Sequence, residues 1–129
     1  MSVNSDFAIA QQTARPSKAL NFTIWGVQIL AAFAFLAAGG SKLSGAPAMV
    51  EMFEKIGFGQ WFRYVTGALE VTGALLLLLP RTAAIGGWLL AAVMIGAIGT
   101  HLFLIGGNPA PAAVLLVLAI TVGWNRWRR

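Results

Sequence analysis

Four long apolar runs, separated by short polar or turn-forming breaks, limit what this chain can fold into. They cover residues 20–40, 62–80, 82–106 and 109–124. An α-helix rises about 1.5 Å per residue, so runs of this length suit the ~30 Å hydrocarbon core of a bilayer. Lipid offers the backbone no hydrogen-bond partners, and the runs are continuous rather than alternating, which excludes a membrane β-barrel. The sequence therefore predicts an all-α membrane protein, a four-transmembrane-helix bundle.

The composition supports a membrane protein. Of the 129 residues, 58% are hydrophobic and only 10% are charged, whereas soluble domains carry about 25% charged residues. The net charge is +5, but the basic residues flank the apolar runs and form no stripe or aromatic-interleaved patch. We therefore expect membrane lipids as partners and no nucleic acid.

The scarcity of cysteine and histidine removes several kinds of chemistry. The chain has no cysteine and one histidine, His101. Disulfides, thiol catalysis and cysteine-ligated metals are excluded, and a multi-histidine zinc site or a bis-histidine haem is not expected. No phosphate-binding loop or HExxH motif occurs either. The sequence predicts no metal site and no covalently bound cofactor.

The domain organisation is simple. Residues 1–19 are polar and predict a flexible N-terminal tail, residues 20–125 a single transmembrane domain, and residues 126–129 a basic C-terminus. Small residues near the end of the first run also suit a cleavable signal peptide. We favour a retained helix, because the apolar core and the polar tail before it are too long for a signal peptide.

Residues 46–57, between the first and second runs, predict a short amphipathic helix. Met49, Met52, Phe53 and Ile56 follow i, i+3, i+4, i+7 spacing, whereas the charged residues lie off that stripe. This helix is too short and too charged to span, so we expect it at the membrane interface or over the mouth of the bundle. The alternative is a solvated loop helix whose apolar stripe faces the core.

The distribution of positive charge predicts the topology. Four spans place both termini on one side, where the chain carries six Lys and Arg residues, against three on the other side. The six are Arg15, Lys18, Arg81, Arg126, Arg128 and Arg129; the three are Lys42, Lys55 and Arg63. The positive-inside rule then places both termini of this multi-pass protein in the cytoplasm.

A carboxylate within the second run raises the question of function. Glu70 lies inside the sequence GALEVTGALLLLLPR, and an ionisable residue within a membrane is a functional-site hypothesis by default. By depth, Glu70 and His101 both fall in the outer half of the bundle. Lys42 at the outer mouth could reach inward to Glu70 or outward to headgroups. Thr66, one turn from Glu70, and Gln28, at mid-depth on the first span, complete the candidate polar site.

Each of these residues also has a structural interpretation. Glu70 could be a packing device, hydrogen-bonded between helices and chemically idle. His101, close to the interface, could serve only as a structural hydrogen-bonding group. The glycines of the second and third runs most simply permit close helix packing.

Three short segments resemble the DoxX family of small bacterial membrane proteins, and more narrowly its DoxX-like branch. They are GGSKLSG after the first run, FEKIGFGQWFRYVTGALEVTGALLLLLPRTAAIGG through the second, and MIGAIGTHLF near the end of the third. The resemblance covers about residues 24–126. It implies a four-helix bundle in the bacterial inner membrane and an association with redox biology, since the family is named after a subunit of a thiosulfate:quinone oxidoreductase. Some relatives look like chaperones for membrane-protein assembly.

Three functions are compatible with this pattern. The first is a subunit, without its own redox centre, of a membrane oxidoreductase or quinone-linked complex, in which His101 and Glu70 serve a quinone headgroup and another membrane or redox protein holds the redox centre. The alternative is a membrane-protein assembly factor or chaperone-like subunit without catalysis. The third is a small proton-coupled transporter, which would need a homo-oligomer. The sequence leaves open whether the chain itself catalyses a reaction.

Overall fold

The computed structural model describes residues 17–128, which are almost entirely helical. The long helices are α2 (Lys18–Ser44), α4 (Trp61–Leu78), α5 (Ala83–Thr100) and α6 (Ala110–Trp127). A short helix, α3 (Pro47–Ile56), joins α2 to α4, and one π-helical turn, η1 (His101–Ile105), extends α5. The described part of the chain contains no strand, which confirms the all-helical fold.

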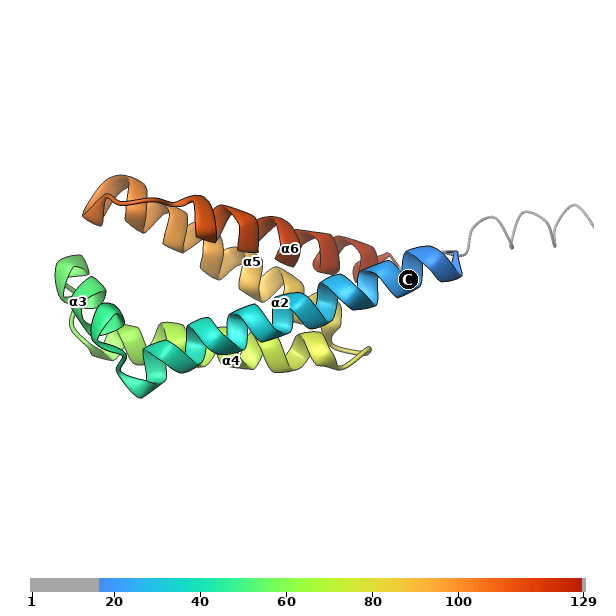
Figure 1. Cartoon of the computed structure of the whole chain (residues 1–129), viewed down its shortest axis with the longest axis horizontal. Coiled ribbons are helices and arrows are strands. Elements are labelled where there is room, and N and C mark those ends of the chain that lie inside the picture. Colours follow the sequence, from blue (N-terminus) through green and yellow to red (C-terminus); the bar gives the residue numbers. More distant parts are fainter. Residues whose placement is uncertain (1–16, 129) are drawn as a thin grey trace, which may run out of the picture.

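The four long helices form an up-and-down bundle. Helix α2 packs on α4, α4 on α5, α5 on α6, and α6 returns to α2. Both ends of the described chain and the α4–α5 turn lie at one end of the bundle, which we call the terminal end (Figure 1). Helix α3 and the η1–α6 connection lie at the opposite end, the α3 end (Figure 1).

Three of the predicted spans have the length and apolar character that crossing a membrane requires. They are α2, the continuous helix Ala83–Ile105 formed by α5 and η1, and α6. Helix α4 is 18 residues long, but it contains Arg63 and Glu70 and is not in this set. The fourth crossing therefore stays a prediction.

The boundaries of the first and last helices differ from those predicted. Most of the predicted tail, residues 1–19, lies outside the described residues, but Lys18 already begins α2, with the Ser17 hydroxyl accepting a hydrogen bond from the Leu20 amide. At the other end α6 continues to Trp127, so Arg126 belongs to the helix and is buried. Although hydropathy falls before Arg126, the helix continues through this residue, whose side chain is hydrogen-bonded to the buried Gln28.

Small residues bring the helix backbones close together. A Cβ atom on Gly39 of α2 would lie 2.8 Å from the carbonyl oxygen of Gly67 in α4. A Cβ on Gly87 of α5 would lie 2.6 Å from the backbone nitrogen of Gly123 in α6. Because lipid removes most of the hydrophobic drive between helices, such close approach is what stabilises a membrane bundle. These two crossings fix the rotation of each helix about its own axis, and so determine which side chains face the neighbouring helix.

Helix α3 occupies the segment predicted to form a short helix, and it is attached lightly. Phe53 is its only buried residue and makes an edge-to-face contact with Phe62 of α4, with ring centroids 5.7 Å apart. Gly45 and Gly57 flank the helix with φ values of 74° and 86°, a left-handed conformation that glycine adopts without steric cost. Whether α3 lies at a membrane interface stays a prediction.

Candidate functional site: a buried ion pair and a histidine cleft

An ion pair between α2 and α4 lies inside the bundle. The Lys42 ammonium is 2.9 Å from Oε1 of Glu70, and the two side chains are 14% and 1% exposed. The close crossing at Gly39 and Gly67, one helical turn before each of these residues, brings the two side chains within reach. The sequence left Lys42 free to point outward to lipid headgroups or inward to Glu70, and in the structure it points inward.

A second polar group, which we call the Gln60–Arg63 bracket, ties three elements together. The Nε of Arg63 donates to Oε1 of Gln60 at 2.7 Å, and a guanidinium nitrogen donates to the backbone carbonyl of Lys42. The side-chain amide of Gln60 in turn donates to the carbonyl of Val50 in α3 at 3.1 Å. The bracket therefore joins the end of α2, the middle of α3 and the start of α4.

The sequence interpretation did not include Arg63 in the polar site. It treated Arg63 only as a positive charge on one side of the membrane, yet the side chain is 5% exposed. Arg63 and Glu70 are seven residues apart, which is about two turns of an α-helix and puts them on the same face. That spacing is the signal from which its burial could have been inferred.

His101 and Glu70 are not brought together. The His101 ring hydrogen-bonds through Nδ1 to the carbonyl of Gly106 at 2.9 Å, and no hydrogen bond or ion pair joins it to Glu70 within residues 17–128. The expectation that the two meet was wrong because it used depth alone. Depth does not fix the face of the helix, and His101 lies on a face that borders a cleft with α3.

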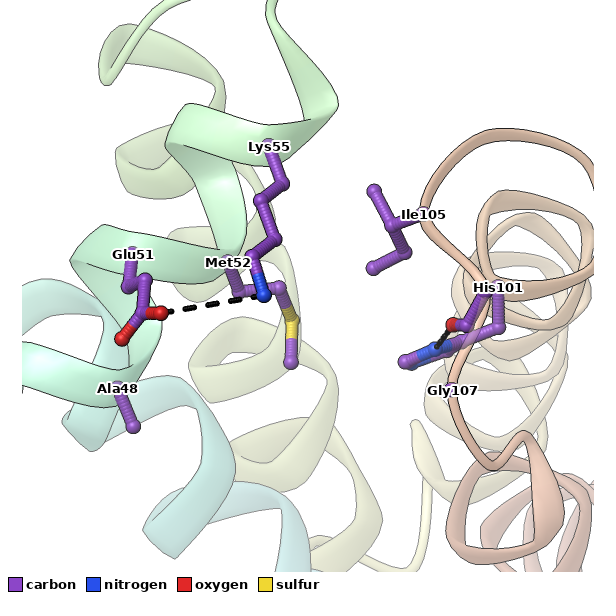
Figure 2. A pocket seen from close by; sticks show the side chains of 8 residues that line it. Ala48, Glu51, Met52, Lys55, His101, Ile105 and Gly107 are labelled. Atoms are coloured by element: carbon purple, nitrogen blue, oxygen red, sulfur yellow. Dashed lines mark hydrogen bonds and ion pairs between the residues drawn. The ribbon is translucent and has the colours of Figure 1, made fainter.

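His101 instead borders a cleft between α3 and η1, which Figure 2 shows from close by. Met52 and Lys55 lie on the α3 side of the gap, and Ile105 and His101 lie on the opposite side. The cleft has a volume of about 280 Å³ and is lined by Ala48, Glu51, Met52, Lys55, His101, Ile105, Gly106 and Gly107. A Lys55–Glu51 ion pair at 3.8 Å, exposed to solvent, lies on its α3 side.

The hydrogen bond to Gly106 defines the state of the neutral His101 ring. A carbonyl oxygen can only accept, so Nδ1 carries the proton and Nε2 keeps its lone pair. The π-helical turn is of a kind that often occurs at functional sites. The cleft therefore offers one hydrogen-bond acceptor from His101 and one cationic donor from Lys55, between apolar walls.

Thr66 and Gln28 do not belong to the ion pair or to the cleft. The Thr66 hydroxyl donates to the carbonyl of Phe62 within its own helix. Gln28 lies toward the terminal end, where its amide donates to the carbonyl of Leu77 and its Oε1 accepts from Nε of Arg126 at 2.8 Å. Arg126 also donates to Oδ1 of Asn21 at 2.8 Å. The predicted polar site is thus divided: Lys42 and Glu70 form the ion pair, His101 borders the cleft, and Thr66 and Gln28 belong to neither.

The buried position of Gln28 makes its replacement costly. We expect Gln28→Leu to lower the free energy of unfolding by about 1.5–3 kcal/mol, the usual range for a hydrogen bond to a charged group. Gln28→Glu keeps an acceptor for Arg126 but sets a carboxylate oxygen against the Leu77 carbonyl, so it should also be destabilising. Unfolding by sodium dodecyl sulfate in mixed micelles measures both. Thr121→Ala, an exposed hydroxyl bonded within its own helix, is the control, and a Gln28→Leu loss no larger than this control would contradict the expectation.

A family model described as the DoxX-like family matches residues 26–124. The chain belongs to the DoxX-like family. The match confirms the resemblance seen in the sequence, and it includes Lys42, Glu70 and His101. Arg126 lies just outside the matched residues.

One relative of this DoxX-like protein is an uncharacterized protein, YdgD, from Bacillus subtilis (strain 168). The two are 43% identical over an alignment of 74 residues, and the alignment covers 54% of this chain and 65% of the relative. The matched segment therefore spans a little less than two thirds of that protein's length. No solved structure matches the chain.

Proposed function

We propose that this DoxX-like protein crosses the bacterial cytoplasmic membrane four times, with both termini in the cytoplasm. The charges of α4 support a fourth crossing because they face inward: Glu70 pairs with Lys42, and Arg63 bonds to Gln60. No charged side chain of α4 is exposed, and several of its exposed side chains are apolar, among them Val65, Leu69, Leu75 and Leu78. Mean hydropathy counts both charges as if they faced lipid, although neither does.

We further propose that the protein is a subunit, without a redox centre of its own, of a quinone-linked membrane oxidoreductase complex, and that the α3–η1 cleft receives the quinone headgroup. The observation that carries this proposal is the hydrogen bond from His101 to Gly106. It leaves Nε2 free to accept a hydrogen bond from a quinol hydroxyl. Lys55 across the cleft can donate to the second oxygen of the ring.

The surroundings of the cleft suit the rest of a quinone. Met52 and Ile105 provide apolar contacts for the flat ring. Leu102, Phe103 and Leu104 of η1 are 61%, 84% and 56% exposed, so an apolar surface for an isoprenoid tail begins next to the cleft. With no cysteine and one histidine, electron transfer is assigned to a partner protein.

Binding of a short-chain quinol to the protein in nanodiscs tests this function. We expect saturable binding, detected by tryptophan fluorescence, and a loss of affinity of about tenfold in His101→Ala, equivalent to about 1.4 kcal/mol for one good hydrogen bond. Thr100→Ala is the matched control, because the Thr100 hydroxyl bonds to Gly96 in its own helix. Absence of saturable binding, or equal affinity in His101→Ala, would refute the quinone site.

The alternative function, an assembly factor, has less support from α3. An assembly factor could use the apolar stripe of α3 to bind a partner, but Phe53, the largest apolar side chain of that stripe, is 3% exposed and packs against Phe62. What α3 does present is the wall of the cleft, which favours a small ligand over a protein client.

A further inference from the structure

We propose that α3 is a hinged cover over the cleft and that the Gln60–Arg63 bracket positions it. The inference rests on the proposed function, because it assigns a means of regulation to the same cleft. The elements involved lie together at the α3 end of the bundle (Figure 1). Gln60 and Arg63 are absent from the cleft lining and act on it through α3.

The hinges are the glycines at the two ends of α3. Gly45 and Gly57 both have positive φ values, and a Cβ atom added at Gly57 would meet nothing within 4 Å. Between them, only Phe53 is buried. A segment with one buried side chain and two glycine joints belongs to the parts of a protein that open at low cost.

The latch is a single hydrogen bond between α3 and Gln60, the residue that precedes α4. Gln60 donates to the Val50 carbonyl in the middle of α3, while the same side chain is held by Arg63. Arg63 is anchored in turn on the end of α2 through the Lys42 carbonyl. Release of the Gln60–Val50 bond would therefore leave α3 held chiefly by the packing of Phe53 on Phe62, with the α2–α4 contact still in place.

The opposite wall of the cleft has a different support. His101 and Ile105 belong to η1, which continues α5, and α5 packs along α6 through Gly87 and Gly123. The cleft is thus built from one lightly held wall, carrying Met52 and Lys55, and one wall continuous with the bundle. A ligand that bridges Lys55 and His101 would draw the cover shut, so its affinity depends on where the bracket places α3.

The absence of cysteine from the chain allows a direct test by maleimide labelling of single-cysteine variants in nanodiscs without ligand. Met52→Cys reports on the cleft wall, and Glu54→Cys, on the exposed side of α3, is the control. We expect Gln60→Leu to speed labelling at Met52→Cys by about fivefold or more, the effect of losing one hydrogen bond on an opening equilibrium. Labelling at Glu54→Cys should not change.

Gln60→Glu separates the latch from the rest of the bracket. It keeps an oxygen for Arg63 but removes the donor to Val50, so labelling at Met52→Cys should rise as in Gln60→Leu. Unchanged rates in both variants would overturn the cover, and so would equal acceleration at Glu54→Cys, which would indicate general unfolding.

Repeating the labelling in the presence of quinol tests the quinone function separately from the movement of α3. Slower labelling of Met52→Cys on addition of a short-chain quinol would support the bound, closed state. Faster labelling in the Gln60 variants with no response to quinol would support the cover while removing the quinone function.

Discussion

Lys42→Ala is expected to lower the free energy of unfolding by about 3–5 kcal/mol, because it leaves a buried carboxylate without its counter-charge. Glu70 is 1% exposed, so its charge has no route to solvent, whereas Lys42 is 14% exposed and ends a flexible stem. Glu70→Gln should therefore cost less than Lys42→Ala, since the freed ammonium can move outward. Unfolding in mixed micelles measures both variants.

Two further variants show whether the loss comes from the unpaired charge. The double variant Lys42→Met with Glu70→Leu removes both charges and should recover most of the stability, as replacement of buried ion pairs by apolar residues often does. Glu51→Gln breaks the exposed Lys55–Glu51 pair and should have no measurable effect. A Lys42→Ala loss as small as that of Glu51→Gln would show that the pair does not hold α2 on α4.

Among glycine-to-alanine substitutions in α5, Gly87→Ala should lower the free energy of unfolding the most. The new Cβ would lie 2.6 Å from the backbone nitrogen of Gly123, and backbone cannot move aside as a side chain can. We expect a loss of about 2–3 kcal/mol, typical of overpacking at a tight contact, measured by the same unfolding experiment.

Gly96 is the matched control for this substitution. It lies on the same helix, but a Cβ there meets nothing within 4 Å. Gly96→Ala should leave the bundle unchanged or stabilise it by up to about 1 kcal/mol, the difference in helix propensity between the two residues. Equal effects of Gly87→Ala and Gly96→Ala would mean that the α5–α6 crossing is looser than described.

The helices were predictable because their signals are local. Apolar runs, glycine and proline breaks and the short Met-Phe stripe each lie within one segment, and the structure places helices over residues 18–44, 47–56, 61–78, 83–105 and 110–127. The spanning status of α4 was harder to judge, since Arg63 and Glu70 lower its hydropathy while their partners are on or near other helices.

The candidate site was only partly predictable. Depth along each helix correctly left Lys42 an inward path to Glu70, but it wrongly paired Glu70 with His101 and wrongly placed Gln28 with both. The bracket of Gln60 and Arg63 was missed, because the spacing of Arg63 from Glu70 indicates which helix face Arg63 occupies but not its partner, the backbone carbonyl of Lys42 on another helix.

By itself the sequence determined the all-helical membrane class, the order of the helices and the DoxX-like family, because hydropathy and turn-forming residues act within each segment. Only the tertiary structure decided which polar groups meet, since that depends on how each helix is rotated about its axis. The rotations are set by close backbone crossings, at Gly39 with Gly67 and at Gly87 with Gly123. Those crossings bring Lys42 within reach of Glu70, whereas the rotation of α5 and η1 leaves His101 bordering the cleft with α3.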